Sequence, residues 1–424
     1  MLTNLIFCLA LFATITLSCS KNINSTSSFT EINIEKKVGS FEKLQLSDYI
    51  DDIQYIPLDS DPVLLRSIYQ LDFYRGMIAV NDKDNCILYD TSGGYIARIG
   101  NQGKGPGEYM FSTNFRFGIN GKVYIQDGRD ILIYDLNGTF IRKFDPEINT
   151  ELSAVRNWSL YNDSLFLGQL PNQTGKEAYK AVIFDDRGKT IKTLQNWIFL
   201  NRESLVNSWI ENHANIYQFN GKTFFKESIN DTLFFINDQY LFEPAYYFKL
   251  GKYGEPVANR ELVAGSAEWK SSANYIYNNN VYEQKNHFFI DLSFYEKHSP
   301  VKRDEPVEKY GTISEYYTFV VLGVFDKITK ELAFSEPSPI DNQFLNTGLY
   351  NDFDGGLNFY PKERVNDSIL AMWIDAYIIK EHVDSDAFKN SNPKYPEKKK
   401  ELEVLAARLA ENDNPVLMLV KLKE

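Results

Sequence analysis

The sequence predicts an all-β protein, a six-bladed β-propeller, and three observations carry this prediction. Aromatic residues make up 15% of the 424 residues, with 27 Tyr and 30 Phe, and such side chains favour the pleated, half-buried surfaces of strands. A hairpin-like unit recurs along the chain. Strand-like segments form six clusters between about residue 50 and the C-terminus. Repeated strand units at this spacing are typical of propeller blades around a central channel.

The recurring unit is clearest in the first half of the chain. Residues 86–100, "CILYDTSGGYIARIG", align with residues 131–145, "ILIYDLNGTFIRKFD", at an offset of 45. A third copy spans residues 181–194, and a weaker fourth copy spans residues 323–334. Each unit consists of an apolar strand, a Tyr-Asp or Phe-Asp pair, a short turn and a second strand. This order predicts a β-hairpin.

The turn residues explain why the hairpins form. An aspartate at the start of a turn accepts hydrogen bonds from the backbone ahead, and glycine adopts a positive φ that other residues resist. We therefore interpret these residues as turn formers rather than catalytic acids. The predicted blade-turn residues are Asp90, Gly93, Asp135, Gly138, Asp185 and Gly188.

The second half of the chain keeps the strand pattern without the Asp-Gly turn. Residues 221–251 and 358–382 supply the remaining strand clusters, and residues 287–297 lead into the weaker fourth copy. The stretch "PEKKKELEVLAARLAENDNP" then predicts one amphipathic helix that begins at Pro396. The segment "PVLMLVKLK", residues 415–423, predicts a final strand. A ring must protect its last edge, so we expect this strand to join the blade that contains residues 51–59.

A glycine-rich run interrupts the strands after the first hairpin. It lacks the Ser or Thr that a phosphate-binding Walker loop needs after its lysine, an acidic residue follows, and "YMFSTNFRFG" reads as a strand rather than a helix. No βαβ unit surrounds it either. We interpret the run as a structural crossing between blades. Its residues are Gly103, Lys104, Gly105, Pro106, Gly107 and Glu108.

The N-terminus predicts export. Residues 1–18 form an uncharged apolar signal segment, and "LSCS" is similar to the lipobox of bacterial lipoproteins, which would make Cys19 the lipid attachment site. A plain secretory signal cut nearby is the alternative. Polar residues then predict a flexible tether over 19–40, and the propeller is expected over 41–424.

Charge and cysteine content limit the partners. The net charge of −12 disfavours nucleic acid and anionic lipid surfaces as partners, so membrane attachment would come through the lipid. Once Cys8 and Cys19 are assigned to the signal and the lipid anchor, Cys86 is left alone, and we expect it to be a small buried side chain.

Several motifs resemble those of the six-bladed β-propeller lipoproteins of Bacteroidetes, which are distantly similar to NHL-repeat propellers. The resemblance runs from about Leu44 to the C-terminus and rests on "GNQGKGPGEY", "NDTLFFIN", "PAYYFKLGKYGEP", "NDFDGGLNFYP" and "NDNPVLMLVKLK". The resemblance implies a propeller fold, a lipid anchor and a location in the cell envelope. It implies no activity and no ligand. Because "CSKNIN" lacks acidic residues after Cys19, an outer-membrane lipoprotein that faces the periplasm is expected.

Few residues suggest a metal-binding, ligand-binding or catalytic site. Asp352 and Asp354 in "NDFDGG" could face one cation, and calcium is the cofactor they would take, although an Asp-stabilised turn is the alternative. The tryptophans Trp158, Trp269 and Trp373 are candidate ligand-binding rings, with core packing as the alternative. The four histidines show no metal-ligand spacing, and no catalytic residue is proposed.

The sequence therefore predicts a monomeric binding or scaffolding module of the cell envelope. Its ligand, a small molecule, glycan, peptide or protein, is expected at the mouth of the central channel, where loops of several blades converge. A hydrolase or lyase that uses carboxylates at the channel mouth is the alternative, because fold alone does not decide function. Converging charged side chains would favour an enzyme or metal site, and a flat aromatic rim would favour binding.

Overall fold

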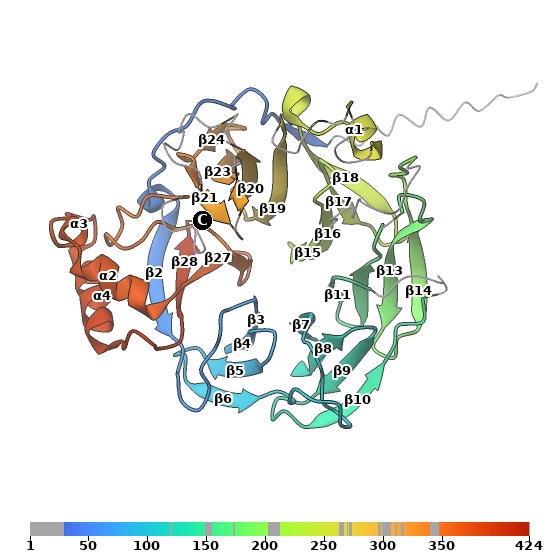
Figure 1. Ribbon diagram of the computed structural model, residues 1–424, viewed down its shortest axis with the longest axis horizontal. Coiled ribbons are helices and arrows are strands. Elements are labelled where there is room, and N and C mark those ends of the chain that lie inside the picture. The colour runs from blue at the N-terminus through green and yellow to red at the C-terminus, as the bar shows by residue number, and fades with distance from the viewer. Residues whose placement is uncertain are drawn as a thin grey trace, which may run out of the picture.

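The computed structural model shows six β-sheets arranged as the blades of a ring, which confirms the predicted six-bladed propeller (Figure 1). The structure describes residues 29–423 with internal gaps. The gaps are residues 119–120, 149–154, 173, 202–212, 263–266, 269, 271–273, 296–297, 299–306, 310–311, 315–317 and 340–346.

The first three blades are four-stranded antiparallel sheets whose strands follow chain order from the channel outward. Blade 1 consists of β3 (Gln70–Tyr74), β4 (Met77–Asn81), β5 (Cys86–Asp90) and β6 (Tyr95–Arg98). Blade 2 consists of β7 (Asn114–Phe117), β8 (Val123–Asp127), β9 (Asp130–Tyr134) and β10 (Phe140–Phe144). Blade 3 consists of β11 (Trp158–Asn162), β12 (Leu165–Gln169), β13 (Tyr179–Asp185) and β14 (Thr190–Gln195).

The next two blades carry additions. Blade 4 consists of β15 (Ala214–Phe219), β16 (Lys222–Glu227), β17 (Thr232–Ile236) and β18 (Phe242–Phe248), with β1 (Thr30–Ile32) outside them. Blade 5 consists of β19 (Ile276–Glu283), β20 (His287–Tyr295), β23 (Thr318–Asp326) and β24 (Leu332–Phe334), with β25 (Ser338–Pro339) also paired to β23. A small hairpin, β21 (Val307–Lys309) and β22 (Thr312–Ser314), precedes β23 in the chain.

The predicted tether over residues 19–40 differs from the structure at its C-terminal end. Thr30–Ile32 forms β1, which pairs in parallel with β18 and extends blade 4. Ile32 and Ile34 are fully buried in the core between blades 4 and 5. Two buried isoleucines therefore hold this segment on the propeller, although the residues around them are polar.

Blade 6 joins the two ends of the chain. Its strands are β26 (Glu363–Arg364), β27 (Ile369–Ile374), β28 (Val416–Leu422) and β2 (Ile50–Pro57). The C-terminal β28 pairs with β27 on one side and with the N-terminal β2 on the other, where Ile53 lies opposite Val420. The predicted closure of the ring by both chain ends is confirmed.

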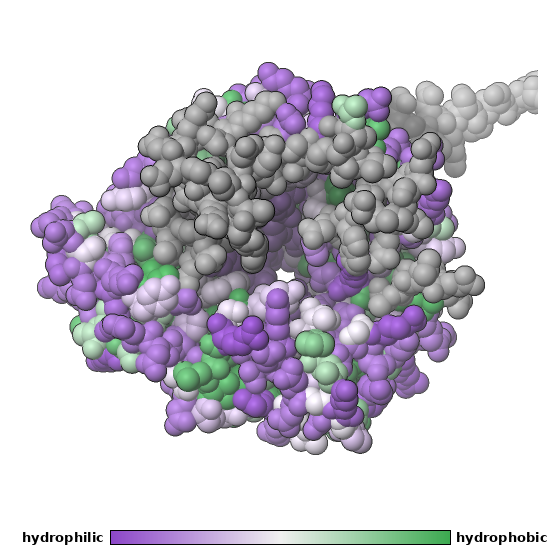
Figure 2. Space-filling view, in the orientation of Figure 1, coloured by the Kyte–Doolittle hydropathy of each residue, from purple (hydrophilic) through white to green (hydrophobic). Residues whose placement is uncertain are grey.

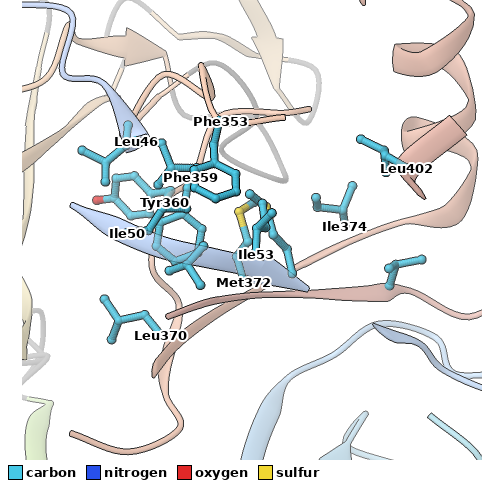
Figure 3. Packing of buried hydrophobic residues seen from close by; sticks show 14 of the residues in the cluster. Leu46, Ile50, Ile53, Phe353, Phe359, Tyr360, Leu370, Met372, Ile374 and Leu402 are labelled. Atoms are coloured by element: carbon cyan, nitrogen blue, oxygen red, sulfur yellow. The ribbon is translucent and has the colours of Figure 1, made fainter. Parts of the chain in front are cut away.

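A large apolar cluster stabilises this closing blade (Figure 3). It brings together side chains from before β2, from β27 and β28, and from the following helices. The labelled members are Leu46, Ile50, Ile53, Phe353, Phe359, Tyr360, Leu370, Met372, Ile374 and Leu402. Burial of this apolar surface ties segments more than 300 residues apart in the chain into one blade.

The helices lie mainly beside this blade (Figure 1). The predicted helix is α4 (Pro396–Arg408), with proline in its first turn. The strand pattern predicted over residues 358–382 is wrong at its end, because Ala376–Asp384 forms α2. Ala376, Ile379 and Val383 recur at helical spacing and pack on the core. The remaining helices of the described residues are α3 (Asp386–Lys389), α1 (Val257–Glu261) and the 3₁₀ turns η1 (Leu46–Asp48) and η3 (Gly251–Tyr253).

The described part of the chain holds no helix with the length and apolar character required to traverse a lipid bilayer. Cys86 is a buried free thiol at the start of β5.

The Asp-Gly turns have the chemistry that the sequence predicts. Oδ1 of Asp135 accepts hydrogen bonds from the backbone N–H of Asn137 (2.9 Å) and Thr139 (2.8 Å). Asp90 and Asp185 accept equivalent bonds in blades 1 and 3. Gly138 has a φ of +80°. These contacts occupy the aspartates within their own turns.

The turn glycines also touch the preceding blade. Gly93 lies against the backbone of Pro57 in β2, Gly138 against Arg98 in β6, and Gly188 against residues at the end of β10. In each case a Cβ atom would collide with atoms of that neighbouring strand. Glycine is therefore required here by the packing between successive blades as well as by the turn itself.

The glycine-rich run connects blade 1 to blade 2. Gly103 N–H donates to the carbonyl of Tyr109 (3.0 Å), and Tyr109 N–H donates to that of Asn101 (3.0 Å). The carboxylate of Glu108 accepts the N–H of Gly105 (2.7 Å), so it caps the loop from within. Gly107, at φ +76°, packs against the ring of Phe140. The run is a closed loop between β6 and β7.

Candidate functional site

Two cavities meet inside the central channel. Their volumes are about 390 and 370 Å³, and Figure 2 shows the ring hollowed at its centre. The first cavity reaches Tyr74, Phe117 and Phe219 at the C-terminal ends of the inner strands. The second reaches Asn157 and His213, just before β11 and β15. Arg116, Tyr217, Glu363 and Arg364 line both cavities, so they mark the point where the two meet.

Arg116 is one of the two arginines at this point. It projects from β7, between the buried Phe115 and Phe117. The hydrogen bond that its guanidinium makes is a long one, 3.4 Å, to the carbonyl of Phe115. Among the residues that the structure describes, it forms no ion pair, and its charge acts on Asp72 and Glu363 through space. Arg116 therefore keeps most of its donor capacity for another group.

Asp72 is held rigidly beside it. Its two carboxylate oxygens accept the backbone N–H of Phe73 (2.9 Å) and of Phe117 (2.7 Å). The second bond joins blade 1 to blade 2. Burial raises the pKa of Asp72, and the positive charge of Arg116 and these two backbone donors oppose the shift.

Glu363, on the innermost strand of blade 6, is the group poised to exchange a proton. Burial raises its pKa to about 7, the negative charge of Asp72 adds to the shift, and the positive charge of Arg116 opposes it. Its carboxylate accepts the N–H of Arg364 at 3.1 Å. A carboxyl group whose pKa lies near neutral pH can donate or accept a proton under ordinary conditions.

Arg364 has a structural role. Its guanidinium donates to the carbonyls of Gln218 (2.7 Å) and Glu283 (3.1 Å) and pairs with Asp367 at 2.8 Å. It also lies 5.1 Å from the centre of the Tyr217 ring. These contacts link the inner strands of blades 4, 5 and 6, so Arg364 shapes the channel wall while Arg116 faces its space.

The channel can therefore hold a small anion and move a proton beside it. A carboxylate, sulfate or phosphate would find the donors of Arg116 and a neighbouring acid that can lose its charge. The charged or titratable groups that line the two cavities are Asp72, Tyr74, Arg116, His213, Tyr217, Tyr282, Asp291, Lys362, Glu363, Arg364 and Asp367.

Of the predicted tryptophans, Trp158 and Trp373 do not line these cavities. Trp158 is fully buried and donates from Nε1 to Gln126 at 2.9 Å, so it is a core residue of blade 3 rather than a ligand-binding ring. Trp373 is partly buried in the core between blades 6 and 1, with Lys362 over its ring at 4.9 Å. Trp269 lies outside the described residues. Among the described residues, the benzene-type rings that line the two cavities belong to tyrosines and phenylalanines.

The two aspartates proposed as calcium ligands have separate partners. Asp352 accepts from the N–H (2.9 Å) and hydroxyl of Ser47 and pairs with the ammonium of Lys394 at 3.1 Å. Asp354 is buried and accepts the N–H of Gly356 at 2.8 Å. An ammonium group thus already neutralises one of the pair. Among the described residues, no group of three His, Cys, Asp or Glu side chains could hold a metal ion.

Sequence reasoning missed Asp72, Arg116 and Glu363. A signal was present in the inner strands, because "QLDFY" and "NFRF" each place a charged residue between apolar neighbours. Alternate residues of a strand point to opposite faces. A charge inside such an apolar run therefore indicates a polar surface such as the channel.

Comparisons with known proteins identify a family and one clearly similar fold. A family model described as "Domain of unknown function (DUF4934)" matches residues 29–421. The crystal structure of a putative exported protein from Bacteroides fragilis aligns with a TM-score of 0.64 at 15% identity, over 94% of this chain and 100% of that one. A member of the duf4221 family from Bacteroides vulgatus aligns with a TM-score of 0.48 at 12% identity, over 88% and 97%. No curated protein matches the sequence.

Proposed function

The chain belongs to the family described as "Domain of unknown function (DUF4934)", and we propose that it is an exported propeller that binds an anionic ligand in its central channel. The single observation that carries this proposal is Arg116. Its guanidinium lies where the two cavities meet and forms no ion pair among the described residues. The ligand is a small acid or the acidic group of a glycan or peptide.

Burial explains why such a cation favours a ligand. A partly buried charge is costly unless it is paired and hydrogen-bonded, and Arg116 presents a planar set of donors that matches carboxylate, sulfate or phosphate oxygens. Asp72 is fixed by two backbone donors, and so it orients the site without closing on the arginine. A bound anion would complete the set of partners.

The experiment is a calorimetric titration with galacturonate and with inorganic phosphate. Binding of either probe is expected, and Arg116→Gln is expected to weaken it by roughly tenfold or more, as for a hydrogen bond to a charged group. Arg129→Gln is the matched control, because Arg129 lies in the same blade, is 53% exposed and pairs with Asp145 on the surface. Equal loss in both variants, or no binding to wild type, contradicts the proposal.

The pH dependence gives a second readout of the same site. A bound anion repels the ionised form of Glu363 and raises its pKa above the free value of about 7. Binding then takes up a proton, so affinity is highest below pH 7 and falls as the pH rises through and above that value. In Glu363→Gln this dependence is expected to vanish.

A second candidate function, a hydrolase or lyase, is favoured by Glu363 itself. A carboxyl group with a pKa near 7, beside Arg116 and the fixed Asp72, is a suitable general acid or base. Charged side chains that converge at the channel also favour an enzyme over a binding module. Mass spectrometry of an oligogalacturonate after incubation separates the two functions: recovery of the intact chain means binding, whereas shortened products that disappear in Glu363→Gln mean catalysis.

We place the protein in the cell envelope as an outer-membrane lipoprotein that faces the periplasm. The lipobox-like "LSCS" supports lipid attachment at Cys19, which lies outside the described residues. The similar structure from Bacteroides fragilis is named a putative exported protein.

Cys19→Ala is expected to move the protein from the membrane fraction to the soluble fraction without changing its melting temperature, because the cysteine would carry only the lipid. Fractionation of cells followed by thermal unfolding measures both. A variant that still sediments with membranes contradicts lipid attachment at this residue.

A further inference from the structure

A third cavity lies between blades 4 and 5 and opens beside the channel mouth. Its volume is about 660 Å³, within the range of ligand pockets. Phe219, Asn220 and Asp367 line both this cavity and the first channel cavity, so the two spaces adjoin. We refer to the cavity between blades 4 and 5 as the interblade groove.

Aromatic rings form the apolar wall of the interblade groove. Phe224 stacks on Tyr217 with 5.2 Å between ring centres and 10° between planes, and Phe235 and Tyr246 continue the wall. Phe219, Phe235 and Tyr246 are only partly buried. Part of each of these rings therefore remains accessible to a ligand.

Lysines border these rings. Lys222 and Lys285 are exposed, and the ammonium of Lys222 lies 4.4 Å from the centre of the Phe235 ring. The ammonium of Lys327 lies 4.6 Å from the centre of the Phe219 ring. It pairs with the carboxylate of Glu283 at 2.7 Å. Three lysines line the groove of a protein whose net charge is −12, together with the carboxylates of Glu283 and Asp367. Because Glu283 pairs with Lys327, the cations considered for a ligand are Lys222 of blade 4 and Lys285 of blade 5.

The backbone holds this arrangement in place. Asn220 (φ +48°) and Gly221 (φ +72°) form the two-residue turn between β15 and β16, which is a tight hairpin geometry. Phe219 and Lys222 lie opposite each other across that turn. The outer edge of blade 4 is paired with β1 at Tyr246–Phe248, so this part of β18 is closed to main-chain pairing with a peptide.

We propose that the interblade groove binds an acidic oligosaccharide, with sugar faces on the aromatic rings and its carboxylate or sulfate groups at Lys222 and Lys285. Distributed lysines fit a chain that carries one charge per sugar better than a single concentrated phosphate. The proposal rests on the proposed function, because the groove opens into the same mouth. The groove specifies the class of the ligand. One end of the bound oligosaccharide enters the channel toward Arg116.

The experiment compares tetragalacturonate with galacturonate and with a neutral galactose tetramer by calorimetry. The acidic tetramer is expected to bind roughly tenfold more tightly than the other two, with an affinity that falls as salt is added. The double variant K222Q and K285Q is expected to remove this advantage and leave galacturonate binding unchanged. Lys122→Gln is the matched control, because Lys122 follows Gly121 in blade 2 as Lys222 follows Gly221 in blade 4.

The outcomes separate the two proposals. Loss of the tetramer advantage in the double variant, with galacturonate binding retained, supports the interblade groove. Equal affinity for tetramer and monomer, or an unchanged tetramer affinity in the double variant, overturns the groove and leaves the channel standing. Tighter binding of a tetraglutamate peptide than of tetragalacturonate overturns the assignment to a glycan. Loss of galacturonate binding in Arg116→Gln supports the channel site, and unchanged galacturonate binding in that variant overturns it.

Discussion

Replacing Gly138 with alanine is expected to lower the free energy of unfolding by roughly 3 kcal/mol, the sum of left-handed backbone strain and overpacking. Gly138 has a φ of +80°, and its Cα faces the backbone carbonyl of Arg98 in the preceding blade. A methyl group would enter that contact, and backbone atoms on both sides would have to move. Urea unfolding followed by far-ultraviolet circular dichroism measures the change.

Gly128→Ala provides the control within the same blade. Gly128 also has a positive φ, +62°, but nothing lies within 4 Å of the place where its Cβ would be. Its replacement should cost only the backbone strain, about 1 kcal/mol. If both variants lose the same stability, the turn glycines serve their turns alone and the contact between blades contributes nothing.

Replacing Glu227 with glutamine is expected to cost about 3–5 kcal/mol, because it leaves a buried lysine without its counter-charge. Glu227 in β16 pairs with Lys180 in β13, and the two side chains are 2% and 1% exposed. The ammonium of Lys180 also lies 3.6 Å from the centre of the Trp197 ring. The pair joins blade 3 to blade 4 inside the protein. A loss below about 1 kcal/mol, as for an exposed pair, contradicts this account.

The pH dependence of this variant has a defined sign. Burial lowers the pKa of Lys180, and Glu227 opposes that shift, so removing the carboxylate lowers the pKa further. The unfolded chain then binds more protons than the folded one between the lowered pKa and the ordinary value of 10.5. Stability of the variant therefore rises with pH in that window. The double variant K180M and E227L should recover most of the loss, because it removes both charges.

The sequence contained enough to predict the ring but not every element of it. Turn chemistry at Asp90, Asp135 and Asp185 located the first three blades, because such turns are determined by neighbours in the chain. Helix α2 was missed because Ile378 and Ile379 continue an apolar run, and the choice between strand and helix there depends on packing against blade 6. β1 was missed because only Ile32 of its three residues is buried.

The channel site could not be predicted from motifs, for a geometric reason. Asp72, Arg116 and Glu363 lie on three different blades, and they become neighbours only when the ring closes. Trp158 did not mark the channel, because its large ring fills the space between two sheets. Charged residues inside apolar inner strands were the better signal.

A crystal structure of the protein with galacturonate tests the central claim most directly. The account predicts that the carboxylate of the sugar lies within hydrogen-bonding distance of the Arg116 guanidinium, beside Glu363, with Asp72 still held by its two backbone donors. A sugar bound elsewhere on the propeller, or an ion pair between Arg116 and Asp72 that closes the channel, would contradict it.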